Sequence, residues 1–140
     1  MKKFLFAGII VLVFMCGCAN VEADVSQISW SDDLTQSLNT AQQEGKPVLI
    51  DFYTRWCGWC KRMDKDTYGN KDVASALLGF VCVKVNAEQH LDLAKKYHVR
   101  GFPCTVFLRS DGEIITVVPG YLDARDFLSL LTKVLAEAGK

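Results

Sequence analysis

The sequence lacks an excess of charge of either sign, internal repeats and low-complexity stretches. Its 16 basic and 16 acidic residues give a formal net charge of +0. Once the amino-terminal segment described below is removed, a small acidic excess remains, so no basic patch is left for a nucleic acid. The composition therefore excludes nucleic acid as an expected partner.

The sequence also lacks the patterns of common cysteine-bound cofactors. A c-type haem site needs His directly after the second cysteine of a CxxC pair, and here Lys61 follows Cys60. A structural zinc site needs a second close ligand pair, and the remaining candidates do not form one: Cys82, Cys104, His90 and His98. We expect no metal and no cofactor, and we expect both histidines to lie on the surface without a catalytic task.

The one long apolar run, Phe4–Met15, is too short for a permanent membrane span. Lys2 and Lys3 precede it and give it the pattern of an export signal. Export predicts a location on the periplasmic side of a bacterial membrane, where stable disulfides are permitted. A dithiol that works in the reduced form would need electrons there, so a membrane electron donor is an expected partner.

Two cleavage positions stay open for this signal. Met15-Cys16-Gly17-Cys18 resembles a bacterial lipoprotein box, which predicts a signal over residues 1–17 and a lipid on Cys18. Alternatively, Val21-Glu22-Ala23 would suit an ordinary signal peptidase, with a signal over residues 1–23.

The two cleavage positions imply different locations. With a lipid anchor, the polar residues 18–27 would form a tether, and Ala19 would direct the protein to the outer membrane by resemblance to bacterial sorting signals. Without the lipid, the protein would be soluble in the periplasm. In either case residues 28–140 are expected to form one domain, which we expect to be a monomer.

Apolar periodicity predicts an alternating α/β order for this domain. The strongest strand candidate, Val48–Tyr53, is apolar at nearly every position, which predicts cover on both faces. A helix is expected to begin at Ser31–Asp33, with acidic residues in its first turn, and to stop at Gly45-Lys46-Pro47. Further strands are expected at 28–30, 80–85, 105–108 and 113–118, and further helices at 60–68, 72–78, 91–97 and after Asp123. Early alternation and a late hairpin predict a mixed sheet with helices on both faces.

Two cysteines three positions apart follow the central strand, within Trp56-Cys57-Gly58-Trp59-Cys60-Lys61. Such a pair can cycle between a closed disulfide and an open dithiol. A helix that begins at Cys57 would leave its sulfur near free backbone N–H groups, which favour the thiolate. Structural bridges and metal sites also use CxxC, so the motif by itself leaves its role open.

Four motifs give the chain a resemblance to the thioredoxin superfamily: Asp51-Phe52-Tyr53, Trp56–Lys61, Lys84-Val85-Asn86 and Gly101-Phe102-Pro103. The resemblance runs from Ile28 to the carboxyl terminus. Lys46-Pro47-Val48 and the segment Met63–Leu78 are most similar to exported thioredoxin-like proteins, among them the C-terminal domain of the transmembrane thiol:disulfide interchange protein. The resemblance implies an α/β thioredoxin fold, which is a central mixed β-sheet with helices on both faces.

The resemblance implies different roles for the two cysteines. Cys57, expected to be exposed at the helix start, would be the nucleophile that attacks a disulfide of a partner protein. Cys60, expected to be more buried, would resolve the mixed disulfide and close a Cys57–Cys60 disulfide. The alternative is a static structural bridge, although so small a ring removes little chain entropy.

Asp51 is the odd residue in its apolar strand, because a carboxylate is costly to bury and burial raises its pKa. A buried Asp51 would suit acceptance of the Cys60 proton, through a water molecule. Lys84 matches the family position whose side chain reaches this acid and tempers its pKa. The alternative is that Asp51 lies solvated at a strand end.

A substrate-binding surface is implied around the cysteines. Trp56 would offer a flat apolar platform, unless it is a plain core aromatic, and Gly58 and Trp59 would lie between the two thiols. Pro103 matches the cis-proline of the family. The Phe102 backbone before it would pair with an extended substrate segment.

Cys104 departs from the family pattern, in which a threonine often follows the cis-proline. It could trap the nucleophile, bind a metal with it, or pack as a small apolar side chain, and packing is the reading we adopt. In the expected sheet order Cys82 and Cys104 flank the central strand, too far apart for a disulfide.

These observations predict a thiol–disulfide oxidoreductase of the cell envelope that reduces or isomerises protein disulfides through its CGWC dithiol. Gly58-Trp59 differs from the Gly-Pro of reducing thioredoxins and also lacks the His of strong oxidants, so the direction of electron flow stays open. The alternative is a redox-silent thioredoxin-fold lipoprotein that binds a peptide or a soft metal such as Cu(I) through Cys57, Cys60 and Cys104.

Overall fold

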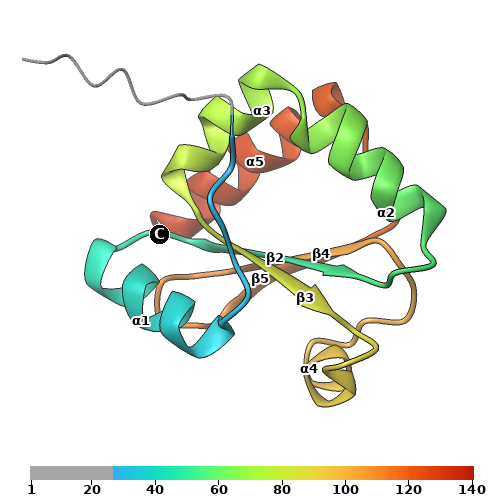
Figure 1. The fold of residues 1–140 in the computed structure, drawn as a ribbon. Coiled ribbons are helices and arrows are strands. Elements are labelled where there is room, and N and C mark those ends of the chain that lie inside the picture. Colours follow the sequence, from blue (N-terminus) through green and yellow to red (C-terminus); the bar gives the residue numbers. More distant parts are fainter. Residues whose placement is uncertain (1–26) are drawn as a thin grey trace, which may run out of the picture.

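The computed structural model describes residues 27–140 (Figure 1). The predicted signal segment, the lipid on Cys18 and nearly all of the tether at 18–27 lie outside the described residues, so they stay predictions. Within residues 27–140, no helix is long and apolar enough to cross a membrane.

A five-stranded mixed sheet forms the centre of the domain. Its order is β1-β3-β2-β4-β5. The pairs β1–β3 and β3–β2 are parallel, and the pairs β2–β4 and β4–β5 are antiparallel. The strands are β1 (Trp30–Ser31), β2 (Val48–Tyr53), β3 (Val81–Asn86), β4 (Cys104–Leu108) and β5 (Ile114–Pro119). The predicted α/β thioredoxin fold with a mixed sheet is confirmed.

Helices cover both faces of this sheet (Figure 1). One face carries α2 (Gly58–Met63), α3 (Lys71–Ala76) and α5 (Ala124–Ala138), and the other carries α1 (Leu34–Glu44) and α4 (Leu91–Lys96). Each face has its own apolar core. Phe107 of the sheet packs with Phe127 of α5 on the first face, while Phe52 packs with Tyr97 on the second.

Local sequence signals explain where α1 begins and ends. The Asp33 side chain accepts a hydrogen bond from the Gln36 N–H at 2.9 Å, and Gly45 closes the helix with a φ of 65°. Asp33 is therefore the N-cap itself, and the prediction of acidic residues in the first turn is wrong. Asp123 caps α5 in the same way, since its carboxylate accepts from the Asp126 N–H.

The segment after the cysteines differs from the predicted helices at 60–68 and 72–78. The helix α2 ends at Met63 and continues as a π-helix, η1 (Asp64–Tyr68); after α3 comes a 3₁₀ turn, η2 (Leu77–Gly79). Gly69 follows η1, and a side chain does not fit there because a Cβ would overlap the Lys65 carbonyl. Asn70 then caps α3, accepting hydrogen bonds from two backbone N–H groups. The i→i+5 bonding of a π-helix has no simple sequence pattern, so the periodicity could not reveal it.

Candidate active site

The two cysteines of the motif form a disulfide at the start of α2. After β2 ends at Tyr53, the chain turns, and the Cys57 N–H donates to the Thr54 carbonyl at 3.3 Å. Cys57 and Cys60 are bonded, with an S–S distance of 2.09 Å and 5.3 Å between their Cα atoms. Cys57 is also the N-cap of α2, because its sulfur accepts a hydrogen bond from the Cys60 N–H at 3.1 Å. The expected Cys57–Cys60 disulfide is therefore present.

The two cysteines are equally buried, whereas the tryptophans beside them in the motif are exposed. Cys57 is 4% exposed and Cys60 is 5% exposed, so the prediction that Cys57 is the more exposed cysteine is wrong for the disulfide form. Trp56 and Trp59 are 71% and 55% exposed. Trp56 is therefore not a core aromatic.

Two aromatic pairs extend from the motif. Trp56 meets Phe102 edge to face, with ring centroids 6.2 Å apart, and the bond from Phe102 to the buried Pro103 is cis. Trp59 packs on Tyr121 at 5.5 Å, and the Arg62 guanidinium lies 5.4 Å from the Trp59 ring centroid. The motif thus presents exposed aromatic surface, joined on one side to the cis-proline loop.

Asp51 lies inside the protein and is paired with Lys84. It is 2% exposed, so the alternative of a solvated strand end is wrong. The two residues are direct neighbours in the parallel β2–β3 register, and Lys84 Nζ donates to Asp51 Oδ2 at 2.7 Å. Burial raises the pKa of Asp51, and the Lys84 charge offsets part of that rise.

Lys84 is held by a second carboxylate and by three aromatic rings. Its Nζ donates to Asp64 Oδ1 at 2.6 Å and lies 4.7 Å from the ring centroid of Trp30, 5.1 Å from that of Tyr68 and 5.4 Å from that of Tyr53. Burial disfavours the ammonium, but the two carboxylates outweigh burial and raise the pKa of Lys84. Lys84 therefore remains a cation.

Four buried oxygens near this ion pair and the motif have no hydrogen-bond partner: Asp51 Oδ1, Thr54 Oγ1, Tyr68 Oη and Thr105 Oγ1. Thr105 is the direct neighbour of Asp51 across the β2–β4 pair. Burial, and then the Asp51 charge, raise the pKa of Tyr68 well above its usual value, so Tyr68 stays protonated. The core beside Asp51 therefore holds hydroxyl donors as well as the ammonium of Lys84.

Sequence reasoning missed four residues of this site: Trp30, Asp64, Tyr68 and Thr105. A signal existed for Asp64, which follows Cys60 by four positions and so shares its face of a continuing helix. Trp30 reaches Lys84 only because the short edge strand β1 pairs with β3. No local pattern marks that pairing.

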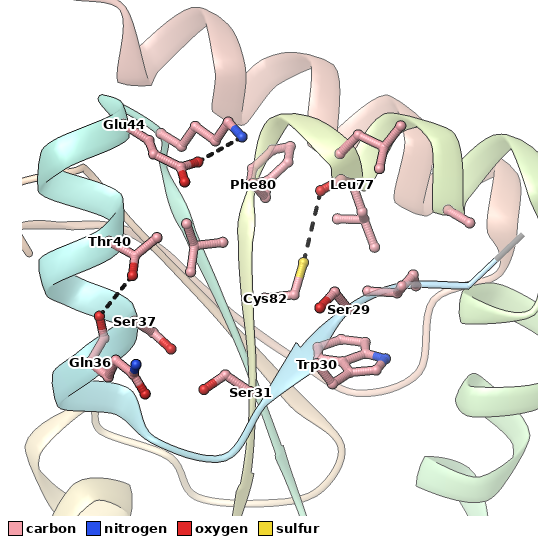
Figure 2. Close-up of a pocket in the computed structure, with 15 residues that line it drawn as sticks. Ser29, Trp30, Ser31, Gln36, Ser37, Thr40, Glu44, Leu77, Phe80 and Cys82 are labelled. Atoms are coloured by element: carbon pink, nitrogen blue, oxygen red, sulfur yellow. Dashed lines mark hydrogen bonds and ion pairs between the residues drawn. The ribbon is translucent and has the colours of Figure 1, made fainter. Parts of the chain in front are cut away.

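Cys82 and Cys104 are buried free thiols on the two strands that flank β2, as predicted. Burial raises the pKa of Cys82 to about 12, and burial together with the Asp51 charge raises that of Cys104 to about 11. Cys82 lines a pocket of about 460 Å³ between α1, β1 and α3, with its sulfur 4.0 Å from the Leu77 carbonyl oxygen (Figure 2). Neither cysteine of the disulfide lines this pocket.

His90 and His98 are exposed, as expected. In the described part of the chain, no group of three or more His, Cys, Asp or Glu side chains is placed to hold a metal ion.

Comparison with known families agrees with this geometry. The family model of a thioredoxin-like domain matches residues 34–135. The chain belongs to the thioredoxin-like family. Its disulfide occupies the motif position that the resemblance indicated.

The curated relatives of the chain include the thiol:disulfide interchange protein DsbD from two bacteria. The protein of Yersinia pestis is 39% identical over 97 residues, which are 65% of this chain and 16% of the relative. That of Vibrio cholerae is 32% identical over 114 residues, which are 77% of this chain and 19% of the relative. The chain thus spans less than a fifth of the length of these relatives.

Solved structures give the same assignment. The C-terminal domain of DsbD from Neisseria meningitidis, in its oxidised form, is 28% identical with a TM-score of 0.64, over 75% of this chain and 98% of that one. A thioredoxin from Thermus thermophilus is 25% identical with a TM-score of 0.73, over 81% of this chain and 91% of that one. The chain is therefore similar to one DsbD domain rather than to the whole relative.

Proposed function

We propose that this protein is a thiol–disulfide oxidoreductase of the cell envelope that reduces or isomerises protein disulfides. The observation that carries the proposal is the Cys57–Cys60 disulfide at the start of α2, where the Cys60 N–H already donates to the Cys57 sulfur. A donor at this sulfur stabilises a thiolate over a thiol once the disulfide is reduced. Cys57 is accordingly the nucleophile.

The first step transfers the bond to a partner protein. The Cys57 thiolate attacks one sulfur of the partner disulfide, a mixed disulfide forms, and the other partner sulfur leaves as a thiolate that takes a proton from solvent. Because Cys57 is buried in the oxidised form, the proposal requires its sulfur to become accessible once reduction opens the ring.

The second step releases the partner. The Cys60 thiol gives its proton to the ionised Asp51, and the Cys60 sulfur attacks Cys57. The Cys57–Cys60 bond forms and the mixed disulfide breaks. The partner sulfur leaves as a thiolate that takes a proton from solvent, so two electrons have passed to the partner. The Lys84 charge favours the Asp51 carboxylate that accepts the proton, because it opposes the effect of burial.

The exposed aromatic surface would receive the partner. Trp56, Gly58 and Trp59 surround the disulfide in the chain, and Trp56 contacts Phe102 of the cis-proline loop. An extended partner segment beside Phe102 and Pro103 would present its own disulfide to Cys57. Such docking uses backbone and apolar contacts and is tolerant of sequence.

The cell-envelope location rests on the export signal, and similarity to a DsbD domain supports protein thiols as substrates and a membrane protein as the electron donor. Lipid on Cys18 would keep a monomeric protein at the membrane, with the outer membrane indicated by Ala19. Two electrons from the donor would reduce Cys57–Cys60 after each turnover.

An insulin-reduction assay with dithiothreitol as the electron source tests the proposal. Wild type should accelerate the reduction, Cys57→Ser should abolish the acceleration, and Cys60→Ser should accumulate mixed disulfides on Cys57. The matched control is Cys82→Ser, which removes a buried thiol outside the motif.

Equal inactivity of wild type and Cys57→Ser would contradict the proposal. If the inactive protein also bound Cu(I) stoichiometrically, the redox-silent binding module would replace it. A measured reduction potential near that of strong oxidants, about −120 mV, would overturn the reductant direction and leave the oxidoreductase class intact.

A further inference from the structure

A cation belongs to the exposed aromatic surface beside the disulfide. Arg62 follows Cys60 by two positions in α2, and its side chain is 59% exposed. Its guanidinium carbon lies 5.4 Å from the ring centroid of Trp59 and 5.7 Å from that of Tyr121. No step of the exchange reaction uses this residue.

Two kinds of contact hold the guanidinium in place. Trp59 and Tyr121 pack on each other at 5.5 Å, and the cation of Arg62 lies close to both rings. In addition, Arg62 Nε donates a hydrogen bond to Asp66 Oδ2 at 3.2 Å. An arginine that rings and a carboxylate already restrain loses less side-chain freedom when it binds a further group. Arg62 is therefore preorganised to bind a ligand.

Most of the hydrogen-bonding capacity of Arg62 is unused. A guanidinium carries N–H donors on Nε, Nη1 and Nη2, and the contact with Asp66 uses only the donor on Nε. Among residues 27–140, neither Nη1 nor Nη2 of Arg62 has a hydrogen-bond partner. The terminal nitrogens of a guanidinium match the two oxygens of a carboxylate. The unpaired donors therefore favour a carboxylate as the ligand.

The local charge also favours an anion. Lys61 and Lys65, in the same helical segment as Arg62, are exposed and form no ion pair within residues 27–140. Asp66 offsets one of these positive charges, and Asp64 is already bonded to Lys84. The surface around Arg62 thus keeps a positive excess, although the whole chain has a formal net charge of +0.

This cation borders the place proposed for the partner segment. The Gly120 N–H donates to the Pro103 carbonyl at 2.8 Å, so the loop that carries Tyr121 is bonded to the cis-proline loop. A partner segment beside Pro103 therefore has the Tyr121 ring, and the Arg62 cation over that ring, at its border.

We propose that Arg62 is a specificity-determining residue: it binds a carboxylate of the partner protein, on a Glu or Asp close in sequence to a cysteine of the partner disulfide. The inference rests on the proposed function, in which that disulfide reaches Cys57. The rings and Asp66 hold the guanidinium while its terminal nitrogens bind the carboxylate. No proton, electron or covalent bond passes through Arg62.

The test uses the full chain and a set of short disulfide-bonded peptides that carry Glu, Gln or Lys at one position near a cysteine. Peptide reduction with dithiothreitol as the electron source gives kcat/KM for each peptide, after subtraction of the uncatalysed rate. Glu and Gln have nearly the same shape, so a preference between them reports the charge. Wild type should prefer the best-placed Glu peptide over its Gln counterpart by about tenfold, the effect of one charge-assisted hydrogen bond. The preference should shrink as salt is added.

Substitutions at Arg62 separate recognition from a structural role. Arg62→Met should reduce the Glu and Gln peptides at equal rates, and Arg62→Glu should prefer the Lys peptide. A purely structural role would instead slow all peptides by the same factor and leave the preference intact, which would overturn the inference. The matched control is Lys96→Met, because it removes an exposed cation that lies 5.3 Å from the Tyr97 ring centroid on the other face of the sheet. Its preference for Glu should equal that of wild type.

A binding measurement keeps the inference and the proposed function apart. Calorimetric titration with peptides whose cysteines are replaced by serine measures affinity without thiol–disulfide exchange. Equal rates and equal affinities for Glu and Gln in a wild type that reduces both peptides overturn the inference alone. If no peptide is reduced but the Glu form binds more tightly, and Arg62→Met removes that difference, the inference stands and the proposed function is rejected. Absence of both reduction and preference rejects both.

Discussion

Lys84 and Asp51 lie side by side on neighbouring parallel strands, and Lys84 Nζ donates to Asp51 Oδ2 at 2.7 Å. The carboxylate is buried, whereas the lysine side chain is 23% exposed and also reaches the surface residue Asp64. A buried acid is thus connected through one cation to an acid at the surface. This arrangement determines how the protein responds to pH and to loss of either partner.

Asp51→Asn should stabilise the protein at high pH. Because the folded-state pKa of Asp51 is raised, its contribution to stability is full below the unfolded-state pKa and is lost as the pH rises through the folded-state value. The variant should therefore match wild type near pH 4 and exceed it by on the order of 1 kcal/mol at pH 8. Urea unfolding of the oxidised proteins measures this. The exposed Asp32→Asn is the control, and a gain that does not grow with pH would contradict the prediction.

Lys84→Met should destabilise the protein at pH 8 by about 2–3 kcal/mol, because it leaves the buried Asp51 carboxylate without a counter-ion. The loss should shrink towards pH 4, because uptake of a proton removes the charge of Asp51. Urea unfolding at both pH values is the measurement. Lys46→Met, which removes the surface pair with Glu44, should cost less than about 1 kcal/mol at either pH. Equal losses of unfolding free energy for the two variants would show that the buried pair stabilises the protein no more than the surface pair does.

Gly69→Ala should lower stability by about 1–3 kcal/mol, because its Cβ would overlap a backbone carbonyl of η1 that cannot yield without unwinding the turn. Asp64 and Tyr68 belong to this turn, so the variant should also lose disulfide-reducing activity. Thermal unfolding with a parallel insulin assay tests both effects. Gly79→Ala, whose added Cβ would meet only a leucine side chain at 4.0 Å, should change neither.

Trp56→Ala should raise the KM for a protein disulfide several-fold and leave stability within about 0.5 kcal/mol of wild type, because the ring is mostly exposed. Steady-state kinetics together with a melting curve separate the two effects. Leu78→Ala, which changes another exposed apolar residue, in η2, should leave the KM unchanged. A similar rise in KM for both variants would argue against a docking role for Trp56.

Cys82 and Cys104 should resist alkylation in the native protein at pH 8, since burial holds the pKa of their thiols at about 12 and about 11. Iodoacetamide labelling of the reduced protein, followed by peptide mass mapping, should find adducts on Cys57 and few on these two. In denaturant, all of them should react. Rapid native labelling of Cys104 would instead indicate a third reactive sulfur at the site.

Much of the fold follows from local signals. The apolar run of β2 predicts a central strand, and the caps at Asp33 and Gly45 bound α1 because each acts within one turn of helix. The π-helix η1 could not be predicted in this way. No periodicity of apolar residues encodes a widened turn, and the close approach of Gly69 to the Lys65 carbonyl is visible only in the structure.

The cysteine pair, the order of strands and helices, and the pairing of Asp51 with Lys84 could all be predicted from the sequence, the last through a family motif. The meeting of Asp64 and the aromatic rings at Lys84, and the burial of the Cys57 sulfur in the disulfide form, could be seen only in the folded protein. The two groups of features differ in the distance along the chain over which their contacts act. Caps and strands depend on neighbours within a few residues, whereas Lys84 joins groups 33 and 20 positions away, which only the packing of η1 and β2 against β3 brings together.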